Sequence, residues 1–293
     1  MRLKLRTTSA ILMMVLVTFL WGTAGVVTRH LHFARSFEVT FWRAASCALA
    51  LGLALSLQQG RAVVWRKLRT ASPLFWASAC CWAVMFTAFM IALTMASVGN
   101  VLITMACGPL LTALIARLAL GYFIPLRTWI AILVAGVGIA AMFATQTGGG
   151  AFWGTVVGMC VPIAGAINWN VSQYGHEHGH DIDLVPAVLV GATISAFLTL
   201  PMAWPLQADA HDAGLLIGLG IFQLALPCAL CISCSKVLKA PQMSLLQLQE
   251  VLFGILLAWL GAGERPAPSV LSGGALVVGA LLVNEWLGMR ERR

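Results

Sequence analysis

Long apolar stretches of about 20 residues, separated by short polar segments, dominate the hydrophobic pattern of this chain. Each stretch is long enough to cross the hydrocarbon core of a bilayer as one helix. Because backbone polar groups in lipid must be paired within the segment, a helix is the expected form of every such run. Ten spans are predicted: Ser9–Thr28, Phe37–Leu57, Pro73–Leu93, Val98–Leu120, Leu126–Phe143, Phe152–Ser172, Leu184–Trp204, Ala213–Ser235, Pro241–Gly263 and Val270–Leu287.

The composition agrees with a chain that is surrounded by lipid. Of the 293 residues, 60% are hydrophobic and only 10% are charged, whereas a soluble globular domain is about 25% charged. A water-soluble protein of this length could not bury so much apolar surface. The chain is therefore predicted to form one polytopic membrane domain.

Small residues within the apolar stretches are expected to serve helix packing. The eight cysteines lie in these stretches, and we expect them to be free thiols that fill space between helices. Two glycine pairs, Gly154 with Gly158 and Gly214 with Gly218, are predicted to let neighbouring helices approach closely.

Lysine and arginine residues are distributed unevenly between the two sides of the predicted membrane. With a cytoplasmic N-terminus, 14 of the 18 basic residues fall on the cytoplasmic side and three on the outer side. Basic residues are normally enriched in cytoplasmic loops. Both termini are therefore expected in the cytoplasm, which requires an even number of spans.

The two halves of the chain resemble each other. The first span contains FLWGTAGVV around Trp21, and the sixth contains AINWNVSQY around Trp169. Aligning Gly121 with Gly263 superimposes the fourth and fifth spans on the ninth and tenth. Five spans per half is an odd number, so the second half must be inverted. Inverted repeats are typical of secondary transporters, whose substrate site lies near the membrane midplane.

The predicted fold class is thus an all-α membrane protein with ten transmembrane helices in two inverted five-helix repeats. Residues 1–145 form the first repeat, and residues 152–293 form the second. The glycine-rich segment 146–151 links them within one membrane domain.

The order of several short motifs resembles the EamA-type branch of the drug/metabolite transporter superfamily. These motifs are Trp21-Gly22, the sequence FWRAA with Arg43, Pro109, Glu250, and the turn Gly263-Glu264-Arg265. The pattern covers essentially the whole chain and is most similar to the aromatic amino acid exporter group. It departs from the family where GYFIP replaces the first Gly-Glu-Arg turn and where Val251 follows Glu250.

This resemblance implies a secondary transporter that exports amino acids, with aromatic and other bulky neutral ones favoured. Export would run from the cytoplasm across the bacterial inner membrane, by alternating access. The implied partners are the amino acid and the lipid bilayer, with possible proton coupling. Nucleic acid and cofactors are not expected. Export of other metabolites or of lipophilic cationic drugs stays open as an alternative.

Large polar side chains within the apolar helices mark candidate substrate contacts, because a polar group in lipid is costly. Glu250 lies near the middle of the ninth span, and Gln247 is three residues earlier on the same helical face. The carboxylate could bind an ammonium group or exchange a proton; alternatively, it only fixes helix packing. The predicted substrate-binding residues are Trp21, Asn100, Thr104, Asn168, Trp169, Gln223, Gln247 and Glu250.

Other residues are predicted to shape the pathway. Trp21 and Trp169 could form aromatic walls of a central cavity. Arg43 lies about six residues into its span, where its side chain is expected to snorkel outward or to pair with Glu38. A structural or gating role is predicted for Arg43 and for three prolines that can bend helices, Pro109, Pro162 and Pro227.

A histidine-rich segment, HEHGHDID, lies between the sixth and seventh spans. Such tracts can bind metals, so a metal-binding membrane protein built on the His176–His180 loop is the alternative from a different class. No buried array of His and Asp accompanies the loop in the predicted spans, and no metal site is therefore predicted. Walker A, Gly-x-Ser-x-Gly and His-Glu-x-x-His motifs do not occur. We expect no enzymatic activity.

Overall fold

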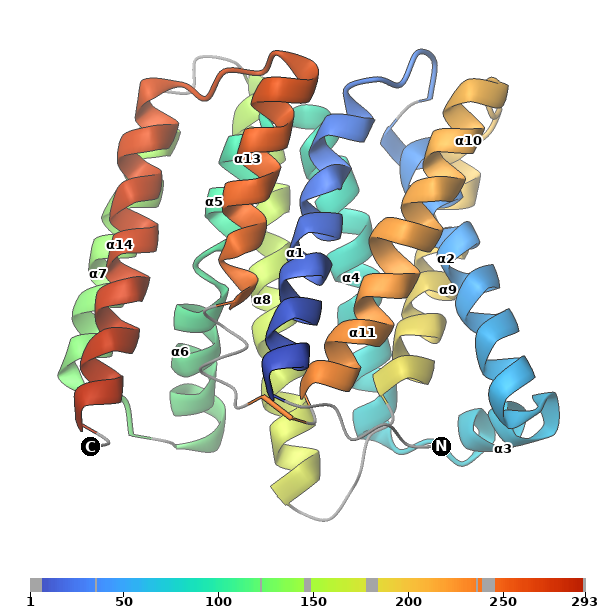
Figure 1. Ribbon diagram of the computed structural model, residues 1–293, viewed down its shortest axis with the longest axis horizontal. Helices are drawn as coiled ribbons and strands as arrows, with labels where there is room; N and C mark the ends of the chain where they lie inside the picture. The colour runs from blue at the N-terminus through green and yellow to red at the C-terminus, as the bar shows by residue number, and fades with distance from the viewer. Residues whose placement is uncertain are drawn as a thin grey trace.

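The computed structural model describes residues 7–34, 36–121, 123–144, 149–177, 184–235, 237–238 and 246–291. Every regular element in this part of the chain is helical (Figure 1). The elements are α1 (Thr7–Thr28), α2 (Ser36–Gln59), α3 (Arg61–Arg69), α4 (Pro73–Met95), α5 (Val98–Met105), α6 (Gly108–Leu120), α7 (Leu126–Ala144), α8 (Gly149–Glu177), α9 (Leu184–Ala203), α10 (Ala210–Gly218), η1 (Leu219–Ala225), α11 (Leu226–Ser235), α13 (Gln249–Ala262) and α14 (Pro268–Glu291).

Most of these helices match the predicted spans. Eight described segments are long and apolar enough to cross a membrane. Two shorter apolar helices, Leu126–Ala141 and Gln249–Ala262, fall where the fifth and ninth spans are predicted. Residues 241–245 of the predicted ninth span lie outside the described part of the chain. The protein is therefore a multi-pass membrane protein.

Corresponding helices of the two halves run in opposite directions. The bundle end where α1 begins is also the end where α14 finishes, whereas α8 begins at the opposite end and runs back (Figure 1). We call this opposite end the distal end. Helix α1 packs along α13, and α8 packs along α5 and α6. In an inverted repeat, α8 is the counterpart of α1, and α5 with α6 is the counterpart of α13, so the two contacts are equivalent. Helix α8 begins at Gly149, within the predicted link, and residues 146–148 lie outside the described part.

Two membrane helices depart from regular α-helical geometry next to a proline. The fourth predicted span is divided into α5 and α6 at Ala106–Cys107, just before Pro109. Proline has no backbone N–H to donate to the carbonyl four residues earlier, and the amide of Leu110 bonds the carbonyl of Cys107 at 3.0 Å. By contrast, α8 continues through Pro162.

The second departure is the π-helix η1, which lies just before Pro227. The amide of Leu226 donates to the carbonyl of Ile221, five residues back. Pro227 cannot donate to the carbonyl of Gln223, so the chain widens by one residue at this turn. As a result, Gln223 sits in an irregular segment in the interior of the bundle.

Close helix contacts depend on glycine at a few positions. A Cβ atom on Gly22 of α1 would lie 2.9 Å from the backbone nitrogen of Gly254 in α13 and 3.0 Å from the Cβ of Phe253. These distances are too short for a side chain, so α1 and α13 can pack this closely only with glycine at position 22.

The glycine pairs predicted from sequence behave differently from each other. A Cβ on Gly154 would lie 2.9 Å from the backbone nitrogen of Ala96, so this glycine permits a close contact. At Gly214 and Gly218, a Cβ would meet nothing within 4 Å. The prediction of a packing site for that second pair is wrong, because no helix in the described part of the chain packs against this face of α10. All eight cysteines are free, as expected.

Candidate functional site

Arg43 of α2 lies in the interior of the bundle, with only 2% of its surface exposed. Its Nε donates a hydrogen bond to Oε1 of Gln223 at 2.9 Å. The guanidinium carbon lies 5.5 Å from the ring centre of Phe89 and 6.0 Å from that of Phe86, both on α4. The expectation that Arg43 snorkels outward or pairs with Glu38 is therefore wrong. The guanidinium points into the bundle, where an amide and two aromatic faces replace water.

Gln223 connects Arg43 to the first helix. It is 2% exposed, and its Nε2 donates to the backbone carbonyl of Trp21 at 3.2 Å. One amide thus joins α1 and α2 of the first half to η1 of the second half. Both its oxygen and its nitrogen are engaged, which fixes the orientation of the Arg43 side chain.

Glu250 lies in the first turn of α13 and is half-buried. No direct ion pair joins its side chain to Arg43 in the described part of the chain. Gln247 lies two residues before the start of α13 at Gln249, and Leu248 between them has helical backbone angles. We call Trp21, Arg43, Gln223 and Glu250 the Arg43 cluster.

The other predicted site residues lie on neighbouring helices and do not bond to the Arg43 cluster. Oγ of Ser78 donates to Oδ1 of Asn168 at 2.6 Å, joining α4 to α8. Thr104 donates to the carbonyl of Asn100 within α5 at 2.7 Å. Trp169 is half-buried in α8. Oδ1 of Asn100 and Nδ2 of Asn168 are buried without a hydrogen-bond partner among the described residues. Such atoms are rare in proteins and suggest a missing partner.

An ion pair joins the two halves at the distal end. Nε of Arg29 donates to Oε2 of Glu264 at 2.6 Å. The same guanidinium donates to the carbonyls of Leu93 and Ala96. Oε1 of Glu264 accepts from the backbone amide of Val98 at 2.7 Å. One carboxylate of the second half thus holds the ends of α1 and α4 and the start of α5.

Two buried carboxylates make further contacts between the halves at the distal end. Asp212 of α10 accepts hydrogen bonds from the backbone amides of residues 32–34, between α1 and α2. Glu38 of α2 accepts from the backbone amides of Gln207 and Ala208, before α10. These bonds occupy the Glu38 carboxylate, which explains why it does not pair with Arg43. We call Glu38, Asp212 and Glu264 the distal carboxylates.

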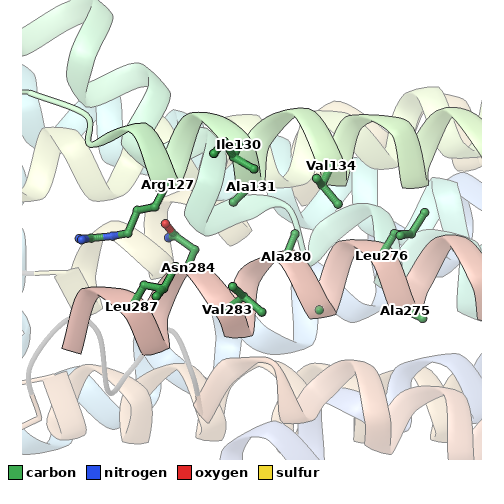
Figure 2. Close-up of a pocket in the computed structure, with 11 residues that line it drawn as sticks. Arg127, Ile130, Ala131, Val134, Ala275, Leu276, Ala280, Val283, Asn284 and Leu287 are labelled. Carbon is green, nitrogen blue, oxygen red and sulfur yellow. The ribbon is translucent and has the colours of Figure 1, made fainter. Parts of the chain in front are cut away.

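A pocket of about 380 Å³ lies away from the Arg43 cluster, between α7 and α14 (Figure 2). Most of its lining is aliphatic, and Arg127 and Asn284 lie at one end. None of the predicted substrate-binding residues lines it. Its position at the edge of the bundle and its apolar lining match a lipid-facing groove. The histidine loop that offered the metal-binding alternative cannot be placed relative to this site, since residues 178–183 and the side chain of His176 lie outside the described part.

Comparisons with known proteins agree with this architecture. A solved crystal structure, whose title names no function, matches 98% of this chain over 99% of its own length, with a TM-score of 0.64 and 19% identity. That likeness concerns the fold. No match is found among curated proteins. The family model described as the EamA-like transporter family matches the chain twice, over residues 8–144 and 152–285. The chain therefore belongs to the EamA-like transporter family and is a membrane transporter of the drug/metabolite superfamily.

Proposed function

We propose that this transporter exports amino acids, aromatic and other bulky neutral ones above all, from the cytoplasm across the inner membrane. The observation that carries the proposal is the pairing of a buried cation and a carboxylate without a direct ion pair between them. Arg43 on α2 and Glu250 on α13 come from opposite halves of the chain. Helix α13 packs along α1, and the Trp21 carbonyl of α1 accepts a hydrogen bond from Gln223, the residue that also holds Arg43.

A zwitterion fits between two such groups. The substrate carboxylate binds Arg43, because a guanidinium presents several donors and its Nε alone is used by Gln223. The substrate ammonium binds Glu250. Phe86 and Phe89 supply aromatic surface near the guanidinium for an apolar substrate side chain, and Trp21 packs against the cluster that contains Phe86. Asn168 and Trp169 of α8 complete the pathway from the side of the second repeat.

The same geometry bears on the alternative substrates. A lipophilic cation would find a partner in Glu250 and aromatic walls in Trp21 and Phe89. It would also be repelled by the buried positive charge of Arg43, which no carboxylate among the described residues neutralises by direct contact. An uncharged or zwitterionic metabolite avoids that cost. The presence of Arg43 therefore favours amino acids over cationic drugs.

Alternating access is the proposed mechanism. The distal carboxylates join the two halves at one end, which supports a conformation that is closed there. The excess of basic residues at the opposite end supports an orientation with this end outside the cell and both termini in the cytoplasm. The interruptions at Ala106–Cys107 and at η1 supply points where helices can bend between the two states.

Proteoliposomes test the proposal. Uptake of several labelled amino acids is measured with the parent protein and with Arg43→Gln, Glu250→Gln and Trp169→Ala variants. Arg61→Gln and Trp153→Ala, both at exposed positions, serve as matched controls. Loss of one charged partner is expected to weaken binding about 10- to 100-fold. Full transport by Arg43→Gln and Glu250→Gln would refute the proposed site, and no transport of any amino acid by the parent would refute the substrate class.

Proton coupling is tested in the same vesicles. If Glu250 exchanges a proton with the substrate, transport depends on an imposed pH gradient, and this dependence disappears in Glu250→Gln. If the parent transports equally well with and without the gradient, the mechanism is facilitated diffusion and Glu250 serves only to bind the ammonium group.

A further inference from the structure

Four metal-ligating side chains from the two halves lie together at the distal end. His32 lies between α1 and α2, whereas Asp209, His211 and Asp212 lie at the start of α10. Each offers one ligand atom, and the four atoms lie within 4.8 Å of one another. His32, Asp209 and His211 are exposed to solvent, so a cation could reach them, and Asp212 is buried behind them.

The side chains are arranged as a compact donor set. The two imidazole rings stack with their centres 4.5 Å apart and their planes within 9°. Nδ1 of His32 lies 3.8 Å from Oδ2 of Asp209, and Nδ1 of His211 lies 3.4 Å from Oδ1 of Asp212. Imidazole nitrogens combined with carboxylate oxygens are ligands that Zn²⁺ binds in tetrahedral sites. Neutral imidazole is the form of histidine that binds a metal.

Backbone hydrogen bonds hold these residues in place without a metal. Oδ1 of Asp212 accepts from the amide of His32 at 2.9 Å, and Oδ2 accepts from the amides of Phe33 and Ala34. Oδ1 of Asp209 accepts from the amide of Asp212 at 2.7 Å, which leaves its Oδ2 facing His32. The donor groups are therefore positioned before a cation arrives, which lowers the ordering cost of binding.

We propose that His32, His211 and Asp209 bind a Zn²⁺ ion, with Asp212 orienting the His211 ring and water completing the coordination. A carboxylate behind a ligating histidine commonly fixes the ring in this way. Because His32 belongs to the first half and the other ligands to the second, the ion bridges the two halves at the distal end. A consequence that rests on the proposed alternating access is that bound Zn²⁺ holds this end closed and slows transport.

This site is separate from the histidine loop noted in the sequence. Helix α8 ends at Glu177, at the bundle end where α1 begins (Figure 1). The proposed site lies at the other end of the bundle, where α10 begins. Zn²⁺ added to the distal face of the membrane would therefore reach the proposed site directly.

Zn²⁺ binding is measured on the full-length protein in detergent, after removal of any histidine tag. Zn²⁺ is titrated against a chromophoric chelator, with the parent, His32→Ala, His211→Ala and the double variant His178→Ala/His180→Ala. The parent is expected to bind one equivalent that both single variants lose and the double variant retains. His32→Gln and His211→Gln, checked by gel filtration, keep the test valid if an alanine variant misfolds. Unchanged binding in the single variants, or binding lost only in the double variant, would overturn the proposal.

The regulatory consequence has its own readout. Zn²⁺ is added to the distal face of proteoliposomes that transport an identified substrate, with Asp209→Asn as a partly disabled site and His30→Ala as a control. Slower transport by the parent but not by His32→Ala supports the bridging role. Zn²⁺ binding with unaltered transport would overturn that role and leave the metal site itself standing. Failure of every amino acid as substrate would not affect the binding result, so the two proposals fail separately.

Discussion

Arg43 and Gln223 meet across the boundary between the two halves of the chain, with Nε of the arginine 2.9 Å from Oε1 of the glutamine. Gln223 lies in a π-helical turn that exists because the following Pro227 cannot donate a backbone hydrogen bond. The π-helical turn in the second half of the chain thus positions Gln223 next to the buried Arg43 of the first half. This hydrogen bond holds the positively charged guanidinium of Arg43 at a fixed position in the interior of the bundle.

Replacing Gln223 with leucine should therefore affect both stability and transport. The substitution leaves Nε of Arg43 buried without its acceptor, which costs about 1–3 kcal/mol in the free energy of unfolding. Thermal unfolding in detergent should shift to lower temperature, and amino acid transport should fall. Gln223→Glu keeps an acceptor for Arg43 and should fold, but its charge neutralises the guanidinium and should still abolish transport.

Gln207→Leu is the matched control, because the Gln207 side chain is exposed and only its backbone amide bonds Glu38. It should unfold and transport like the parent. Equal unfolding temperatures for Gln223→Leu and the parent would contradict the role given to this hydrogen bond.

Gly22→Ala should disrupt the contact between α1 and α13. The added methyl group would lie 2.9 Å from the backbone nitrogen of Gly254, which cannot move without shifting its helix. Overpacking of this kind costs about 1–3 kcal/mol. The same change at Gly214, where a Cβ meets nothing within 4 Å, should stabilise α10 by about 0.5–1 kcal/mol through helix propensity. The unfolding temperature is expected to fall for Gly22→Ala and to rise for Gly214→Ala. A decrease in both variants would show that the loss of stability in Gly22→Ala does not come from its contact with α13.

The membrane spans were predictable because lipid imposes a simple rule on sequence: about 20 apolar residues make one helix. Pro109 indicated that the fourth span is divided at Ala106–Cys107, because proline removes a backbone hydrogen-bond donor from its own helix. The π-helix before Pro227 was not expected. A proline can bend a helix, widen it or leave it intact, and Pro162 leaves α8 intact. The packing of neighbouring helices determines which of these occurs.

The partners of polar residues could not be predicted from sequence. Arg43 bonds a residue 180 positions away, and its predicted partner Glu38 is occupied by amides before α10. Proximity in sequence suggested the wrong pair because both groups lie near the start of one span. The distal carboxylates carried a weak signal: each lies close to the end of a predicted span. Only the tertiary packing shows that backbone amides of the other half donate hydrogen bonds to these carboxylates.

Pro227→Ala should separate conformational effects from binding effects. Alanine restores a backbone donor for the carbonyl of Gln223, so η1 can relax toward a regular α-helix. The stability of the protein should be unchanged or higher. The Gln223 side chain would rotate relative to Arg43, and transport should slow. A variant that is stabilised but impaired would fit this mechanism, whereas unaltered transport would show that the π-helical turn is not required.

The ion pair between Arg29 and Glu264 leads to a prediction about the distal end. Both side chains are partly exposed, so the pair alone should contribute little, about 0–1 kcal/mol. Glu264 also accepts the backbone amide of Val98, and Glu264→Ala should therefore speed hydrogen exchange of that amide and of the α4–α5 connection. Arg265→Ala, at the exposed neighbouring position, should leave exchange unchanged. Peptide-level hydrogen exchange measured by mass spectrometry distinguishes these outcomes. Equal exchange in Glu264→Ala and the parent would mean that Asp212 and Glu38 hold the distal end closed without it, because their hydrogen bonds between the halves do not involve residues 264 or 98.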